Sequence, residues 1–298
     1  MTGVTRAIVL GAGGPVGIGW ESGLIVGLAQ QGVDVGAADA VFGTSAGSFV
    51  GAQLALGIDI ASTAAERAAE GAALYRQTEV GPVAEQLQSL MSAVVTAVLA
   101  DAPPEETRRT IGRLSLESVV PTEEKFLRFF GVFEGRHWPE RFACTAVDTE
   151  TGELVVWKAE SGAELARAVA SSCSVPCMFP PVSIAGRRYM DGGARSSLNA
   201  DLAIGNDRVV VISVNVLYPP EEAGDPISEV VMRGLATELA DLRSSGSQVE
   251  IIEPNLEFLE VSDGGASVMD FTKPMQAYEI GVRQGAEEAK RIAALWDR

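Results

Sequence analysis

The sequence predicts an α/β fold with a mostly parallel central sheet. Short apolar segments alternate with helical segments through the first fifty residues, which is typical of parallel strands joined by crossover helices. Strand patterns return after a long helical stretch and continue toward the C-terminus. The 298 residues contain no internal repeats, low-complexity tracts or clear linkers. We therefore expect one domain spanning residues 1–298.

The first elements follow one another closely. Residues 6–14, "RAIVLGAGG", predict a strand and a glycine-rich turn, and residues 19–32, "GWESGLIVGLAQQG", predict a helix closed by Gly32. The segment "AVFG" at residues 40–43 predicts a second strand. It runs directly into "GTSAGS", after which small and apolar residues indicate another helix, ending at Gly57.

Residues 61–127 differ in character from what precedes them. They include alanine-rich and charged helical stretches, broken at "DAPPEETRR". We interpret this part as a helical insertion over one end of the sheet.

The remaining pattern is again α/β. Residues 141–157, "RFACTAVDTETGELVVW", predict a hairpin, because turn residues separate two apolar runs. The segments that follow are a helix at 163–174, an irregular proline-bearing link at 175–186, strands at 187–190, 207–216 and 249–255, and an amphipathic helix at 275–296.

Charge and cysteine content limit the possible functions. The net charge of −17 disfavours nucleic acid as a partner and strong attraction to anionic lipid surfaces. The cysteines Cys144, Cys173 and Cys177 are odd in number and lack metal-ligand companions, so we expect small buried side chains in a reducing compartment. The first residues do not resemble a signal peptide, and the longest apolar run in a helical pattern, 90–100, is too short to span a bilayer. A cytoplasmic location without a transmembrane span is expected.

Ser45 is the candidate nucleophile. It lies in a G-x-S-x-G pattern between Gly43 and Gly47, where small residues allow a sharp strand-to-helix turn that exposes the serine oxygen. A serine needs a base to become a strong nucleophile.

Two residues are candidates for that base. His137 is the single histidine, but its segment "FEGRHWPERF" does not resemble the loop that carries a triad histidine, and a surface or local structural role is expected. Asp191 follows a short strand and precedes Gly192 and Gly193, which would allow close placement of its carboxylate in a desolvated site. An ordinary turn aspartate would give the same D-G pattern.

The glycine-rich turn "GAGGPVGIG" offers backbone N–H groups near a helix N-terminus, where an oxyanion or a phosphate could bind. Nucleotide motifs fit poorly. A dinucleotide fingerprint beginning at Gly11 would need glycine in place of Val16, and Trp20 and Glu21 follow Gly19 where a phosphate-binding loop needs lysine and a hydroxyl residue.

A glycine-rich turn, G-x-S-x-G and a downstream D-G-G, in this order and without a suitable histidine, resemble the patatin-like phospholipase family. The segment "ASSCSVPCMFPPV" at 170–182 extends the resemblance, which covers about residues 6–197. It implies a three-layer α/β/α fold and a Ser-Asp dyad acting on lipid acyl esters, with Ser45 as nucleophile and Asp191 as base. Gly13 and Gly14 would supply the oxyanion N–H groups, supported by Gly11 and Gly17. No metal or cofactor is implied.

The sequence departs from the family pattern at Val16, where a basic residue is usual, and at Ala12, which replaces a glycine. Loss of the basic residue weakens the expectation of charged-headgroup recognition and leaves room for neutral glycerides or simple esters. Two other functions stay open: acyl transfer through the same acyl-enzyme, and a catalytically silent lipid-binding or regulatory role. Residues 83–100 are expected to form either a buried helix face or a lid that makes transient contact with a lipid surface. No oligomeric state is predicted.

Overall fold

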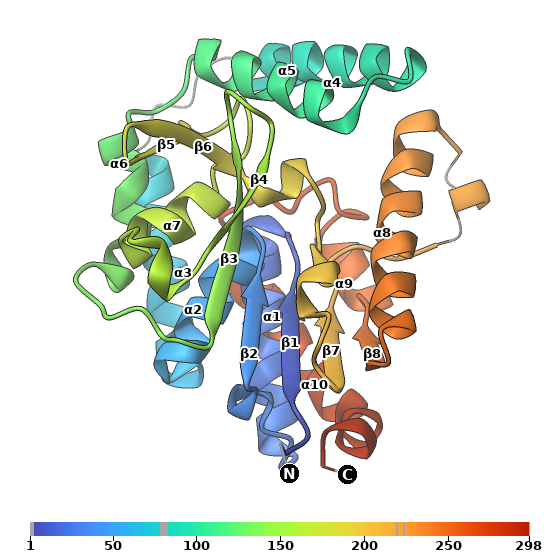
Figure 1. Ribbon diagram of the computed structural model, residues 1–298. Helices are drawn as coiled ribbons and strands as arrows, with labels where there is room; N and C mark the ends of the chain where they lie inside the picture. Colours follow the sequence, from blue (N-terminus) through green and yellow to red (C-terminus); the bar gives the residue numbers. More distant parts are fainter. Residues whose placement is uncertain (1–2, 78–82, 219, 223, 298) are drawn as a thin grey trace.

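The computed structural model describes residues 3–77, 83–218, 220–222 and 224–297, which contain an eight-stranded sheet of order β5-β6-β3-β2-β1-β7-β8, with β4 paired to β3 outside this order (Figure 1). The strands are Arg6–Leu10 (β1), Ala40–Gly43 (β2), Phe142–Asp148 (β3), Leu154–Trp157 (β4), Val182–Ile184 (β5), Arg187–Asp191 (β6), Arg208–Ile212 (β7) and Gln248–Ile252 (β8). Neighbours from β3 through β2, β1 and β7 to β8 are parallel, whereas β4, β5 and β6 pair antiparallel. The predicted mostly parallel sheet is confirmed.

Helices cover both faces of this sheet. They are Gly14–Gln30 (α1), Ala46–Leu56 (α2), Ile60–Arg76 (α3), Val83–Leu99 (α4), Pro104–Glu117 (α5), Glu123–Leu127 (α6), Leu165–Ser172 (α7), Pro226–Ser244 (α8), Leu256–Val261 (α9) and Pro274–Trp296 (α10).

The alternation of side chains along β1 shows the three layers. Ile8 and Leu10 belong to the core beneath α1, α2 and α10, while Ala7 and Val9 pack in a second core with α8. Successive residues of a strand face opposite sides, so a strand buried on both sides is continuously apolar, as "AIVL" is. The chain therefore has the expected three-layer α/β/α architecture.

The first and last long helices pack at very short range. A Cβ atom on Gly23 of α1 would lie 2.1 Å from the carbonyl oxygen of Tyr278, and one on Gly285 of α10 would lie 2.4 Å from that of Leu24. Glycine at these positions lets the two backbones touch, which fixes α1 against the sheet. The N-terminus of α1, where the glycine-rich turn lies, is fixed with it.

The helices between β2 and β3 take two different places. In Figure 1, α4 and α5 lie across the top of the molecule, beyond the ends of the central strands. Helix α3 instead packs against α1 and α10. Among the described residues, no helix combines the length and apolar character needed to cross a bilayer.

One predicted segment was wrong. The link expected to be irregular at 175–186 contains β5, which forms a hairpin with β6. The connecting residues Ala185 and Gly186 both have positive φ, 50° and 80°, as a tight two-residue hairpin turn requires. The three residues of β5 are too few to give a strand periodicity. The Ala185–Gly186 dipeptide was therefore the one local signal for a hairpin. No element was predicted for α8 or α9.

Candidate active site

The glycine-rich turn and the serine turn lie side by side because their strands are neighbours. Parallel pairing of β1 with β2 sets Leu10 beside Gly43 at the strand ends. Two backbone hydrogen bonds then join the turns: Thr44 N–H donates to the Leu10 carbonyl at 3.0 Å, and Gly47 N–H donates to the Gly11 carbonyl at 2.9 Å. Two segments separated by a whole crossover helix thus form one rigid unit.

Ser45 occupies the sharp turn that the sequence predicted. Its φ of 53° and ψ of −117° fall in a region that side chains rarely adopt, and α2 begins at the next residue. A Cβ on Gly47 would lie 2.1 Å from the Leu10 carbonyl oxygen, so this flanking position admits only glycine. Gly43 is comparably tight, because its Cβ would lie 2.5 Å from the Gly47 carbonyl oxygen.

The N–H groups of Gly13 and Gly14 lie at the N-terminus of α1 and make no hydrogen bond within the described residues. Gly14 has φ +58°, and a Cβ there would meet the Val268 carbonyl oxygen at 2.6 Å. The positive end of the α1 dipole lies at these groups. They are therefore free to bind an oxyanion, and Gly14 lines the same cavity as Ser45.

The neighbouring turn positions are filled as follows. Gly17 N–H closes the first turn of α1 on the Gly13 carbonyl at 2.8 Å. Val16, which stands where a basic residue was expected, is buried, and its N–H donates to the Val268 carbonyl at 3.1 Å. The glycine-rich turn consequently presents backbone donors but no cation.

Asp191 ends β6 and is only 4% exposed. Asp191 pairs with Ala146 of β3. On its other side β3 pairs with β2, where Cys144 lies beside Gly43. Strand β3 therefore separates the strand that ends at Asp191 from the strand that leads into Ser45. Gly193 N–H donates to Asp191 Oδ1 at 2.7 Å. This bond holds the Asp191 carboxylate closely in place, as the D-G-G segment predicted.

Close packing explains the other glycine of that segment. A Cβ on Gly192 would lie 2.1 Å from Thr145 Oγ1, so this position admits no side chain without displacement of β3.

Burial raises the pKa of Asp191 from its ordinary value of 3.8 to about 7, while the Gly193 N–H and the Ser45 hydroxyl act in the opposite direction. The effect of Ser45 on this pKa indicates that its hydroxyl lies close to the carboxyl group. No hydrogen bond of standard geometry joins the two side chains, and Oδ2 of Asp191 is buried without a partner among the described residues. We take Oδ2 as the oxygen available to a proton, since Oδ1 is already bonded.

A buried polar network that the sequence did not reveal supports both turns. Thr44 Oγ1 and Thr145 Oγ1 are 2.9 Å apart, and Asn199 Nδ2 donates to Thr44 at 3.0 Å and to the Ser196 carbonyl at 2.8 Å. Asn199 has φ +50°, a conformation that asparagine tolerates better than most residues. No short motif announces this network, because its members come from three distant segments.

Glu21 is a second buried carboxyl group that the motif analysis did not assign. It is fully buried on α1, and neither carboxyl oxygen has a hydrogen-bond partner of standard geometry within the described residues. Burial raises its pKa well above the ordinary value, opposed by the Gly11 N–H.

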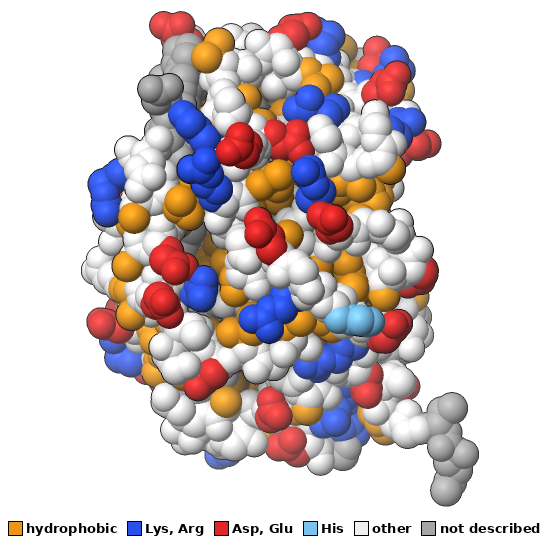
Figure 2. Space-filling view, turned by 90° about the vertical axis from the view of Figure 1, so that its left-hand side faces the viewer, with side chains coloured by type: hydrophobic (Ala, Val, Ile, Leu, Met, Phe, Trp, Pro, Cys, Tyr) orange, Lys and Arg blue, Asp and Glu red, His pale blue; other side chains and the backbone are white. Residues whose placement is uncertain are grey.

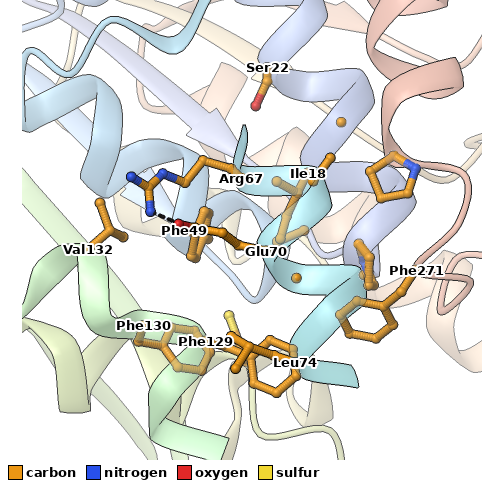
Figure 3. A pocket seen from close by; sticks show the side chains of 18 of the residues that line it. Ile18, Ser22, Phe49, Arg67, Glu70, Leu74, Phe129, Phe130, Val132 and Phe271 are labelled. Atoms are coloured by element: carbon orange, nitrogen blue, oxygen red, sulfur yellow. Dashed lines mark hydrogen bonds and ion pairs between the residues drawn. The ribbon is translucent and has the colours of Figure 1, made fainter. Parts of the chain in front are cut away.

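Ser45 opens onto a cavity of about 540 Å³ (Figure 3). Its walls come from α1, α2, α3, the 3₁₀ segment Arg128–Phe133 and the start of α10, and its lining is predominantly apolar. Aromatic side chains dominate one end, among them Phe49, Phe129, Phe130 and Phe271. Such a space suits an apolar chain better than a polar metabolite.

One ion pair interrupts the apolar wall. Arg67 and Glu70, both on α3, approach to 2.7 Å and line the cavity. Helix α3 therefore forms a wall of the cavity, whereas no described residue of α4 does. The lid role of residues 83–100 stays a prediction, and the helix from this region that lines the cavity is α3.

His137 lies away from this site. It is exposed (Figure 2), its Nδ1 donates to the Trp138 carbonyl at 2.8 Å, and it does not line the cavity. The same view shows acidic and basic side chains interspersed on this face. Cys144 and Cys177 are buried as expected, whereas Cys173 is partly exposed and lines the cavity.

In the described parts of the chain, no group of three His, Cys, Asp or Glu side chains could hold a metal ion.

Comparison with known proteins gives consistent matches. The family model for patatin-like phospholipases matches residues 8–204. Uncharacterised NTE family proteins of Mycobacterium bovis and Mycobacterium tuberculosis are 27% identical over 161 residues, which cover 45% of this chain and 27% of theirs, so the chain spans about a quarter of the length of these relatives. VipD from Legionella pneumophila aligns with a TM-score of 0.44 and 14% identity over 96% of this chain and 67% of its own. Because the family model covers well over half of the sequence, the chain belongs to the patatin-like phospholipase family.

Proposed function

We propose that the protein is a serine-dependent lipid acyl hydrolase in which Ser45 is the nucleophile and Asp191 the general base. One observation carries the proposal: a buried carboxyl group with a pKa of about 7 lies close to a serine that is held in a strained turn and lines an apolar cavity. A base works best when its pKa is near the working pH. In water, an aspartate would be too weak a base for this task.

The chemistry follows from the positions of these groups. Asp191 Oδ2 accepts the hydroxyl proton of Ser45 as Oγ bonds to the ester carbonyl carbon. The carbonyl oxygen becomes negative and is stabilised by the free N–H groups of Gly13 and Gly14. The bond to the leaving alcohol then breaks, and the alcohol takes the proton from Asp191. Asp191 then takes a proton from water, and the resulting hydroxide attacks the acyl carbon. The bond from this carbon to Ser45 Oγ breaks, the fatty acid leaves, and Asp191 returns the proton to Ser45.

The substrate class follows from the lining of the cavity. Its aromatic end accommodates an acyl chain, whereas the turn beside Ser45 offers no cation because Val16 replaces the basic residue. We therefore infer an ester of a long-chain acid as substrate. An alcohol in place of water would convert the same acyl-enzyme into an acyltransferase.

Hydrolysis of p-nitrophenyl esters with acyl chains of increasing length tests the proposal. Wild type should hydrolyse them, Ser45→Ala should not, and Ser244→Ala at the exposed end of α8, outside the cavity, serves as the matched serine control. Adding glycerol distinguishes the products, since an acyltransferase would form acylglycerol at the expense of free fatty acid. Equal hydrolysis by wild type and Ser45→Ala would refute the assignment of the nucleophile.

A further inference from the structure

The C-terminus of α7 contacts both members of the proposed dyad. Residues 172–174, which we call the α7 end, lie within the segment "ASSCSVPCMFPPV" that the sequence analysis noted without assigning it a role. Ser172 and Ser174 are fully buried, and Cys173 faces the cavity. Three consecutive residues at a helix end thus lie where β2 and β6 bring Ser45 and Asp191 together.

A side chain satisfies the backbone N–H of Ser45. This N–H donates to Ser172 Oγ at 3.0 Å, which is the one acceptor for this group among the described residues. The Ser45 carbonyl accepts from the backbone N–H groups of Ser48 and Phe49 at 2.9 and 3.3 Å, in the first turn of α2. It also accepts from Ser48 Oγ at 2.6 Å and Cys173 Sγ at 3.1 Å.

These bonds bear on the strain of the turn. A non-glycine residue at φ 53° and ψ −117° is strained and persists only where neighbouring groups determine its conformation. The Ser45 carbonyl is held by the first turn of α2, whereas the Ser45 N–H has its acceptor on the α7 end.

The third residue of the α7 end, Ser174, holds the base. The backbone N–H of Asp191 donates to the Ser174 carbonyl at 2.9 Å, and Ser174 Oγ donates to the Pro180 carbonyl at 2.8 Å, which anchors the segment. Asp191 is thereby fixed at its backbone by Ser174 and at its carboxylate by Gly193. The separation of the serine and the aspartate depends on one short, rigid piece of chain.

We propose that Ser172 and Cys173 are positioning residues that hold Ser45 in its reactive conformation, and that the α7 end as a whole sets Ser45 against Asp191. This inference rests on the proposed function. Their contributions are unequal, because Ser172 is the sole acceptor for the Ser45 N–H among the described residues, whereas Cys173 shares the carbonyl with Ser48 Oγ and with the backbone N–H groups of Ser48 and Phe49.

Substitutions along three neighbouring positions test the proposal. Ser172→Ala leaves the buried Ser45 N–H unpaired and should lower kcat for a p-nitrophenyl ester by roughly 10- to 100-fold with KM unchanged. Ser172→Thr retains the acceptor oxygen and should restore most of the rate. Cys173→Ala should lower kcat by less than about threefold, because Ser48 still donates to the carbonyl.

Ser171→Ala is the matched control. Ser171 is also fully buried, but its Oγ accepts from Trp157 Nε1 at 3.0 Å and donates to the Ala168 carbonyl at 2.7 Å, away from the dyad. This variant should lose thermal stability and keep its kcat. A purely structural role for Ser172 predicts that both variants lose stability and that neither loses kcat.

Two readouts separate this inference from the proposed function. If wild type hydrolyses the ester and Ser172→Ala does so at the same kcat, the positioning role is wrong and the function stands. A crystal structure of Ser172→Ala gives a test that needs no activity: the inference expects the Ser45 φ to leave the region near 53°, and an unchanged backbone would overturn it.

Discussion

Replacing Asp191 by asparagine should abolish hydrolysis and, at alkaline pH, make the protein more stable. The variant side chain has nearly the same shape, and its Oδ1 can keep the bond from Gly193 N–H. It carries no charge, so the cost of ionising a buried carboxyl group disappears. The catalytic base would therefore be a residue that the fold holds at the expense of stability.

The magnitude follows from the pKa of Asp191. Its folded-state value of about 7 exceeds the ordinary value of 3.8, so the folded protein binds this proton more tightly than the unfolded chain. The associated stability is complete below about pH 4 and is lost as pH rises through 7. The full difference corresponds to about 4 kcal/mol above pH 8, of which roughly 2–3 kcal/mol develops between pH 5 and pH 9.

Urea unfolding of wild type and Asp191→Asn at pH 5 and pH 9 measures this effect. The free energy of unfolding of the variant, relative to wild type, should be larger at pH 9 than at pH 5 by roughly 2–3 kcal/mol. Asp241→Asn, an exposed position on α8, is the matched control. An identical difference between wild type and Asp191→Asn at the two pH values would refute the reasoning, because it would mean that Asp191 is not a buried group with a raised pKa.

Three further predictions concern the site and its neighbours. The kcat/KM for ester hydrolysis should rise as pH increases through about 7, since Asp191 accepts a proton only when ionised; a profile that is flat from pH 6 to 8 would exclude it as the base. His137→Ala should keep its activity within about twofold of wild type in the same assay, because the side chain is exposed and away from the cavity. Gly47→Ala should destabilise the fold by more than about 3 kcal/mol in thermal denaturation, because its Cβ would lie 2.1 Å from the Leu10 carbonyl oxygen; a melting temperature equal to that of wild type would show that β1 and the serine turn are not in contact.

Short-range steric requirements made the serine turn predictable from the sequence. A strained turn at Ser45 needs glycine at both flanking positions, and six consecutive residues contain the whole pattern. The three layers were similarly accessible, because strands buried on both faces are continuously apolar and the helices between them have clear ends. The family assignment followed from the order of such local motifs, and the family model confirms it.

Contacts between distant segments could not be predicted in this way. The wall of the cavity at α3 is formed by small and half-buried residues, whose pattern does not distinguish them from a surface helix. The apolar run at residues 90–100 drew attention to α4 instead, which packs against α5 and α8. The support of Ser45 by Ser172, and of Thr44 by Asn199, joins positions more than a hundred residues apart. Neither serine nor asparagine carries a periodicity that would reveal such a partner.

Covalent labelling with a fluorophosphonate, read by intact and peptide mass spectrometry, tests the central claim most directly. The reagent forms a stable bond only with an activated serine, so it reports the nucleophile without knowledge of the substrate. The account predicts a single adduct on the peptide that contains Ser45, with much slower labelling of Asp191→Asn. An adduct on another serine, or no adduct on folded protein with and without detergent micelles, would contradict it.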